Sequence, residues 1–362
     1  MKIHKGLEGV VADTSAVSLV DGIRGELSYR GYTIGSLVDQ PFAAVAALVA
    51  LDRFDPVFAT RLTAASALSA RETALVLGLP AELHPMHVLQ GVTPLLDRSD
   101  AFADLGEAAQ GFTIAAKLPA LVATHFRRAP VNEAIPGDPI GQFMRQIGAA
   151  ESNAVRRAFE AAQILQIEHG FNAGTFTARV VASTLAPVEN ALSAAYGALH
   201  GVLHGGADQA ALETADEVGA PERAAAFVDE CLATGRRVMG MGHREYKVVD
   251  PRARHLKRLA EALSAGTEHE RTFRTLEAIE RRFTERMAEQ GKALHANVEF
   301  YKGLVFRALG LPPRFFTALF AMARSFGYLG HFIECRADNR IVRPQAHYVG
   351  RAVRDFDGTI RE

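Results

Sequence analysis

The chain has 362 residues, enough for one large domain or two moderate ones. Hydrophobic residues make up 48% of it and charged residues 22%, an ordinary mixture for a globular protein. The formal net charge of -1 argues against a nucleic-acid partner and against an anionic membrane surface as a partner.

A small β element is predicted near the start of the chain. Two short runs, residues 17–20 and 23–27, flank Asp21-Gly22, a dipeptide that favours a two-residue hairpin turn. Residues 1–6 lack the apolar core of a signal peptide, and no uncharged apolar run approaches the roughly 20 residues that span a bilayer. Cys231 and Cys335 are far apart and are typical of free thiols in a reducing cytosol. We therefore expect a cytoplasmic protein.

The remainder of the chain is predicted to be mostly helical. A Pro-rich stretch over residues 129–139 indicates a loop. Thr267 with Glu270 suggests a capping box at the start of a helix. Residues 314–334 are apolar nearly all round, which favours a buried helix. The helix after Glu270 has one apolar face, formed by residues spaced three or four apart: Phe273, Leu276, Ile279, Phe283 and Met287.

Polar residues of the types used in catalysis and binding gather in four clusters, residues 168–176, 200–209, 240–252 and 297–303. In the second, His204 precedes two glycines and a helix-forming run, which places it at a helix N-terminus. The positive end of the helix dipole disfavours imidazolium, so a neutral His204 is expected to donate to a developing enol oxygen. The alternative is a histidine that only caps a buried turn. A zinc site with His200 is disfavoured, because no glutamate base lies between the two histidines.

Two charged residues in apolar surroundings also need partners. Arg324 lies in an apolar helix, where an unpaired guanidinium is too costly, and its partner is either a substrate carboxylate or a side chain such as Glu334. Glu299, between Val298 and Phe300, is either functional or a salt-bridged structural acid. The Gly-x-Gly stretch over residues 240–242 forms an ordinary turn or brings backbone amides close to a ligand.

In this order, the clusters resemble those of the citrate synthase family, which includes 2-methylcitrate synthases. The resemblance extends from residues 6–10 and 25–32 to residues 341–344, and its most specific runs are residues 203–207, 242–252 and 338–344. The length resembles that of the short bacterial and archaeal form. The implied fold is all-α with two domains, apart from the small N-terminal β-hairpin. By analogy, residues 1–207 and 312–362 form a large domain, and residues 208–311 form a small mobile domain that carries the catalytic carboxylate.

The resemblance also implies which groups bind the substrates. His169, Arg252 and Arg324 match the groups that hold oxaloacetate, and Arg343 matches an arginine that reaches the site from the other subunit of a homodimer. Arginine suits carboxylates because its planar fork pairs with both oxygens. The segment that matches the CoA-binding residues comprises Val238, Met239, Gly240, Met241, Gly242 and Lys247.

Three residues match the catalytic groups of the family. His204 would donate to the thioester oxygen, Glu299 would take a proton from the acyl α-carbon, and His243 would polarise the ketone and protonate the new alkoxide. The implied reaction condenses acetyl-CoA or propionyl-CoA with oxaloacetate, gives citrate or 2-methylcitrate plus CoA after thioester hydrolysis, and needs no metal or redox cofactor. The sequence does not distinguish between the two acyl groups.

Three departures from the family pattern fall inside this site. Glu299 stands where the family has aspartate, Gly174 where it has a serine near the catalytic histidine, and Asp208 where it has asparagine. Two other functions therefore stay open. One is a weakened or repurposed paralogue that binds CoA or a dicarboxylate. The other is a lyase that cleaves a citryl-type thioester.

Overall fold

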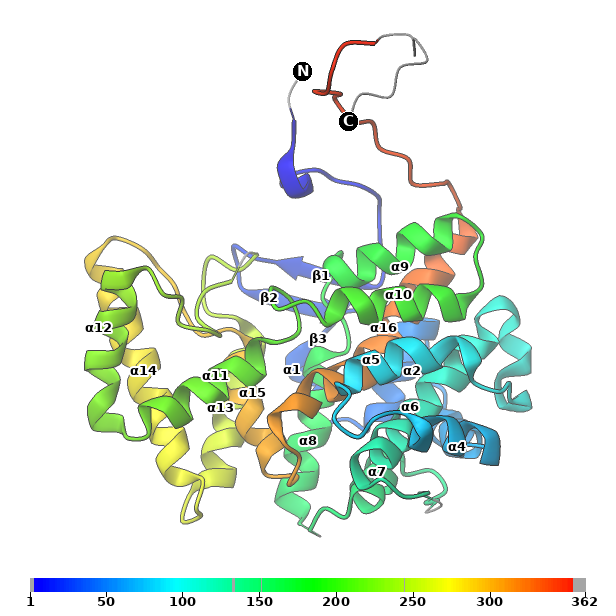
Figure 1. The fold of residues 1–362 in the computed structure, drawn as a ribbon, viewed down its shortest axis with the longest axis horizontal. Helices are drawn as coiled ribbons and strands as arrows, with labels where there is room; N and C mark the ends of the chain where they lie inside the picture. The colour runs from blue at the N-terminus through cyan, green and yellow to red at the C-terminus, as the bar shows by residue number, and fades with distance from the viewer. Residues whose placement is uncertain (1–2, 132–133, 151, 244, 354–362) are drawn as a thin grey trace, which may run out of the picture.

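The computed structural model describes residues 3–131, 134–150, 152–243 and 245–353. Within these residues, helices dominate, and one small antiparallel sheet lies near the N-terminus (Figure 1). The sheet has the order β1-β2-β3, with β1 at Ser18–Asp21, β2 at Glu26–Tyr29 and β3 at Tyr32–Thr33. The expected all-α fold with a small β element is thus confirmed.

The predicted two-residue hairpin turn is wrong. Asp21 pairs with Glu26 at the end of the β1–β2 ladder, so residues 22–25 form a four-residue loop. The Asp21 carboxylate accepts hydrogen bonds from the backbone N–H groups of Ile23 and Arg24 at 3.0 and 2.9 Å, which ends the strand early. The loop also holds the site segment, because the backbone N–H of Lys247 donates to the carbonyl oxygen of Gly22 at 2.8 Å.

The first ten α-helices precede His204, and helix α16 later returns into their core (Figure 1). The bounds of these ten are α1 Ile34–Leu37, α2 Phe42–Leu51, α3 Phe58–Ala65, α4 Ala70–Gly78, α5 Pro85–Val92, α6 Ala109–Arg127, α7 Pro139–Ile147, α8 Asn153–Gln166, α9 Ala173–Ser183 and α10 Val188–Leu199. Those that follow are α11 Ala207–Val218, α12 Ala224–Thr234, α13 Pro251–Ser264, α14 Glu270–Glu289, α15 Val298–Arg307 and α16 Phe316–Ala337.

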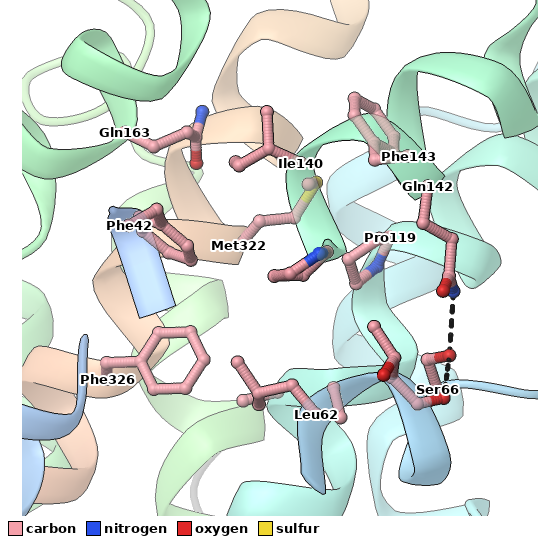
Figure 2. A pocket seen from close by; sticks show the side chains of 14 residues that line it. Phe42, Leu62, Ser66, Pro119, Ile140, Gln142, Phe143, Gln163, Met322 and Phe326 are labelled. Carbon is pink, nitrogen blue, oxygen red and sulfur yellow. Dashed lines mark hydrogen bonds between the residues drawn. The ribbon is translucent and has the colours of Figure 1, made fainter. Parts of the chain in front are cut away.

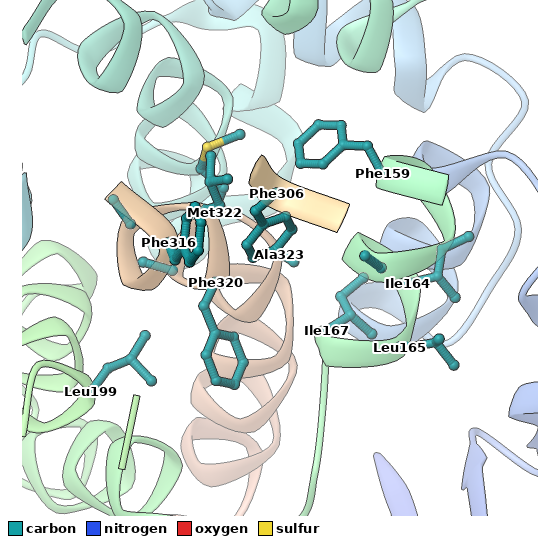
Figure 3. Packing of buried hydrophobic residues seen from close by; sticks show 14 of the residues in the cluster. Phe159, Ile164, Leu165, Ile167, Leu199, Phe306, Phe316, Phe320, Met322 and Ala323 are labelled. Carbon is teal, nitrogen blue, oxygen red and sulfur yellow. The ribbon is translucent and has the colours of Figure 1, made fainter. Parts of the chain in front are cut away.

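Helix α16 is the buried helix that the apolar run over residues 314–334 predicts. Every residue from Phe316 to Phe332 on it is buried. Figure 3 shows its side chains packed among residues of α8, α10 and α15. The labelled partners around Phe316, Phe320, Met322 and Ala323 are Phe159, Ile164, Leu165, Ile167, Leu199 and Phe306. A helix apolar on all sides can be stable only when other elements cover it in this way.

Helices α11 to α15 lie together on the left of Figure 1. The predicted apolar face of α14 is confirmed, because Phe273, Leu276, Ile279, Phe283 and Met287 are all buried. The predicted capping box is wrong: α14 begins with His269 as its N-cap, without a side-chain cap. The Thr267 hydroxyl instead donates to the carbonyl oxygen of Ser264 at 2.8 Å, which closes the turn after α13.

Candidate active site

His204 lies in the loop between α10 and α11, two residues before the N-cap Gly206. The loop turns back on α10 here. The approach is so close that a side chain at Gly205 would overlap the carbonyl oxygen of Leu199. Burial lowers the pKa of His204 to about 4, with a further contribution from the Arg324 charge. His204 is therefore neutral at pH 7, as the sequence predicts, although burial rather than the helix dipole is the main cause.

Two contacts reach one nitrogen of the His204 ring. Nε2 lies 3.1 Å from Oδ1 of Asn172 and 3.4 Å from the backbone nitrogen of Gly174. The first contact requires a proton on Nε2, whereas the second requires a lone pair there, so the tautomer follows from which contact dominates. Among the described residues, none hydrogen-bonds to Nδ1.

His243 has a better-defined tautomer. Its Nδ1 accepts hydrogen bonds from the backbone N–H groups of Glu245 and Tyr246 at 3.0 and 3.2 Å, so the proton of the neutral ring is on Nε2. Nε2 lies 3.4 Å from Nη2 of Arg252, and two donors at this distance do not bond each other. An acceptor oxygen between them would bond to both. Burial, followed by the Arg252 charge, lowers the pKa of His243.

Arg252 is 2% exposed in the first turn of α13 and is held by Asp250. Its Nε and Nη2 donate to the two Asp250 oxygens at 3.0 and 2.8 Å. The same carboxylate accepts the backbone N–H of Val298 at 3.2 Å, which ties the start of α13 to the start of α15. His169 completes this side of the site, with Nε2 3.2 Å from the Tyr246 hydroxyl and its ring 5.3 Å from that of His243. Burial, then the Arg252 charge, lowers the pKa of His169 well below its ordinary value.

Arg324 is 1% exposed on α16, and its Nε donates to the carbonyl oxygen of Gln166 at 2.7 Å. Its guanidinium stacks over the Phe320 ring at 4.5 Å. No carboxylate of the described residues lies within ion-pair distance of it. Glu334, the alternative partner, is engaged by Arg179 at 2.8 Å instead. A buried guanidinium without a counter-ion favours an anionic ligand.

Glu299 is half-buried in the first turn of α15. Its backbone N–H donates to Oδ1 of the N-cap Asn297 at 3.1 Å, which fixes the start of the helix. Within the part of the chain that the structure describes, Glu299 forms no ion pair, so the alternative of a salt-bridged structural acid is not supported. Its charge acts on the rings of both His204 and His243, so the three residues lie within electrostatic reach of one another.

The predicted CoA segment runs beside this centre. Gly240 and Gly242 have φ of 78° and 83°, values that favour glycine. The Gly240 carbonyl accepts from the Asn297 N–H at 2.9 Å, and a Cβ at Gly240 would lie 2.8 Å from the Phe300 ring. The segment is therefore held against the residues that precede Glu299. Its remaining predicted members are Val238, Met239, Met241 and Lys247.

Among the described residues, Arg343 forms no hydrogen bond or ion pair with another predicted site residue. It is exposed in the extended segment after α16, and its Nη1 donates to the carbonyl oxygen of Pro344 at 2.8 Å. Figure 1 shows this segment leading away from the helices.

A family model described as "Citrate synthase, C-terminal domain" matches residues 6–345. The chain belongs to the citrate synthase family, and it is an enzyme of the citrate synthase type. A citrate synthase of Acidithiobacillus ferridurans is 34% identical to it, covering 97% of this chain and 96% of the relative. A 2-methylcitrate synthase of Mycobacterium tuberculosis is 33% identical, covering 99% and 93%. The crystal structure of citrate synthase from Thermotoga maritima has a TM-score of 0.88 and 31% identity, covering 98% of both chains.

One departure from the citrate synthase pattern has a structural explanation. At Gly174 a side chain would overlap the hydroxyl and ring of Tyr328, which projects from α16. Tyr328 is fully buried, and its hydroxyl has no hydrogen-bond partner among the described residues. The space left by the missing serine is thus filled by a tyrosine hydroxyl.

Sequence reasoning missed four groups that hold the site together: Asn172, Tyr246, Asp250 and Gln166. The first three lie inside the motifs, and Asp250 before Pro251 was recognisable as an N-cap. Gln166 gave no signal, because it acts through its backbone carbonyl on a residue 158 positions away.

The disfavoured zinc site finds no support. The His200 ring stacks on that of His84 at 4.3 Å, whereas His204 contacts Asn172, and no group of described residues is suited to hold a metal ion. Both cysteines are buried free thiols. None of the described helices is long and apolar enough to cross a bilayer.

A small apolar cavity of about 30 Å³ lies elsewhere, between α2, α3, α6, α7, α8 and α16 (Figure 2). It has room for about two water molecules. Gln163 lines it, and the amide of that side chain has no protein partner among the described residues. None of the predicted site residues lines this cavity.

Proposed function

We propose that this chain condenses acetyl-CoA or propionyl-CoA with oxaloacetate to give citrate or 2-methylcitrate and CoA. The observation that carries the proposal is Arg324, a buried guanidinium near Arg252 that has no carboxylate of the described residues within ion-pair distance, the buried Glu168 acting on it only from farther away. A dicarboxylate supplies the missing negative charge. Arg252, His169 and, from the partner subunit, Arg343 would complete its binding site.

The first chemical step is enolisation of the thioester. The Glu299 carboxylate takes a proton from the acyl α-carbon while neutral His204 donates a hydrogen bond to the thioester oxygen. The required tautomer has the proton on Nδ1, so Nε2 would accept the Gly174 N–H at 3.4 Å and its 3.1 Å contact with Asn172 Oδ1 would not be a hydrogen bond. A neutral donor suits the enol, and the pKa of about 4 keeps His204 uncharged at physiological pH.

The second step joins the carbons. The enol attacks the ketone, whose oxygen lies between Nε2–H of His243 and Nη2 of Arg252, the two donors that are 3.4 Å apart. His243 then protonates the alkoxide. Hydrolysis of the citryl-type thioester releases CoA and makes the reaction irreversible. These steps move protons and form a carbon–carbon bond, so the scheme calls for no metal or redox cofactor.

We further propose a homodimer whose small domain, residues 208–311, closes over a large domain of residues 1–207 and 312–362. The last nine of these residues, 354–362, lie outside the described residues. Closure would exclude water from the enol and from the thioester intermediate. A site completed by the partner would also explain why Arg343 is exposed in a single chain.

The test is release of free thiol from acetyl-CoA, propionyl-CoA and butyryl-CoA, with and without oxaloacetate. We expect oxaloacetate-dependent release from at least one of the first two. The choice between them depends on one methylene, about 1–3 kcal/mol. Binding of CoA or oxaloacetate without turnover would instead assign a repurposed paralogue, and faster cleavage of a citryl thioester would assign a lyase.

A further inference from the structure

An ion pair between Asp208 and Lys302 is sealed from solvent behind the candidate active site. Asp208 Oδ2 and Lys302 Nζ lie 3.3 Å apart, and both side chains are 0% exposed. The pair joins the first turn of α11 to α15. The helices are in close contact here, because a Cβ at Gly303 would lie 2.8 Å from the Asp208 carbonyl oxygen.

The pair is poorly suited to a purely stabilising role. Asp208 Oδ1 accepts the backbone N–H of Gln209 at 2.8 Å, but neither Oδ2 nor Nζ has a partner with hydrogen-bond geometry among the residues that the structure describes. Burial raises the pKa of Asp208, and the Lys302 charge only partly opposes this. A buried pair with unfilled hydrogen bonds is commonly no more stable than apolar residues of the same volume.

The position of the pair suggests another role. Lys302 lies one turn after Glu299 on α15, and Asp208 lies in the first turn of α11, which follows the loop that holds His204. Lys302 Nζ also lies 4.0 Å from the centroid of Phe320, the ring on which Arg324 stacks. The Glu299 charge acts on His204, Asp208, His243 and Arg252. The other charged groups that act on these residues are Lys302, Arg324, Asp250 and Glu245.

We infer that Asp208 and Lys302 are positioning residues for enolisation, which hold His204 and Glu299 at a fixed separation and keep the surroundings of the base electrically neutral. The inference rests on the proposed function, since it concerns the step that Glu299 and His204 perform. With the pair intact, Asp208 and Lys302 together add no net charge to the surroundings of Glu299. Loss of one partner leaves a net charge next to the base.

The experiment compares wild type with D208N, K302M and the double variant D208N/K302M. The titration of Glu299 is followed by NMR with carboxyl-labelled glutamate, its signal being the one that E299Q removes. Because D208N leaves a cation near the base and K302M leaves a carboxylate, the Glu299 signal should titrate at lower pH than wild type in D208N and at higher pH in K302M. The double variant should titrate within a few tenths of a unit of wild type.

The rate of α-hydrogen exchange in the bound acyl-CoA is the second readout. In the double variant, which leaves no unpaired buried charge, we expect a decrease of about tenfold, because small displacements of a base are costly. Oxaloacetate binding should change less than twofold, since its arginines are untouched. The matched control is E72Q/K117M, which removes another buried pair, with Nζ–Oε1 at 2.7 Å, and should leave both readouts unchanged.

Equal Glu299 titration midpoints in all four proteins, or wild-type exchange in the double variant, would overturn the inference. Wild-type protein without any exchange would contradict the proposed function, and the NMR titration would still decide whether the pair controls Glu299.

Discussion

At the scale of single residues, Glu299 is the group whose placement matters most. Glutamate is one methylene longer than the family's aspartate, and a displacement of about 1 Å can lower a rate 100-fold. The start of α15 is fixed by the Asn297 cap and by the close approach of Phe300 to Gly240. The backbone at Glu299 is therefore fixed in place, and the length of the side chain determines where its carboxylate lies.

We predict that E299D loses activity, by about 100-fold, because the shorter acid no longer reaches the α-carbon from this backbone position. E299Q should abolish enolisation, since an amide cannot accept the proton. Both are measured as hydrogen–deuterium exchange at the acyl α-carbon and as kcat for condensation. A large gain of both in E299D would mark the chain as a weakened paralogue.

A second residue-scale prediction concerns Gly174. We expect G174A to lower both Tm and kcat, because the new methyl group would overlap the Tyr328 hydroxyl in a fully buried place. Adding Y328F should recover part of the loss. The control is G78A at a helical glycine where an added Cβ would meet no other atom within 4 Å, so alanine is expected to be neutral or stabilising. Thermal unfolding and steady-state kinetics give the two readouts. A G174A variant with the Tm and kcat of wild type would show that the Tyr328 side chain can move aside without cost.

Motifs could predict the residues that act through their own side chains, but not those that act through the fold. His204, His243 and Arg324 stand out because their residue types are unusual in their local surroundings. The Gln166 carbonyl that holds Arg324 carries no side-chain signal. The overlap that a side chain at Gly174 would have with Tyr328 likewise depends on how α9 crosses α16. The local sequence pattern does not predict this crossing.

At the scale of secondary structure, periodicity predicted the helices better than local chemistry predicted their ends. The apolar face of α14 and the buried α16 follow from patterns repeated over several turns. The hairpin turn and the capping box each depend on a single side chain that had alternative partners. Asp21 bonds to its own loop, and Thr267 bonds to the preceding turn.

Helix α16 also carries a pH-dependent anchor. Burial raises the pKa of Glu334, but His331, whose Nδ1 lies 3.7 Å from Oε2, and a hydrogen bond from the Ala16 N–H outweigh it and hold the pKa at about 2. Because this folded-state pKa lies below the ordinary value of 4.5, its stabilising contribution is present above pH 4.5 and is lost as pH falls toward 2.

We therefore predict that E334Q is less stable than wild type at pH 6, by roughly 2 kcal/mol, and that the difference shrinks at pH 3. Urea unfolding at the two pH values measures it. The variant E82Q, at an exposed glutamate, should show no such change. A difference between E334Q and wild type that stays constant with pH would contradict the role of this carboxylate.

At the scale of the whole molecule, the all-α fold was predictable because motifs from one end of the chain to the other resemble those of one family. The hydrophobic periodicity alone predicts helices, but it does not predict how these helices pack against one another. The position of Arg343 shows the remaining gap, since one chain leaves this residue exposed and away from Arg324. In the homodimer that we propose, the partner subunit would bring it to a site.

We predict that R343A subunits and H243A subunits, each inactive alone, regain activity when mixed. In a hybrid dimer, one site receives both an intact His243 and a partner's intact Arg343. Random exchange of subunits makes about half of the dimers hybrids, and each hybrid has one intact site of its two. Up to about one quarter of wild-type activity is therefore expected. No recovery, with subunit exchange shown independently, would contradict a shared site.

Formation of the carbon–carbon bond tests the central claim most directly. Acetyl-CoA and propionyl-CoA labelled with ¹³C in the acyl group are each incubated with oxaloacetate and the wild-type protein, with E299Q as the control. The account predicts that the labelled α-carbon of at least one of them appears in a tricarboxylic acid, together with free CoA, and only with wild-type protein. Label found solely in acetate or propionate, or no change of the label with either acyl-CoA, would contradict it.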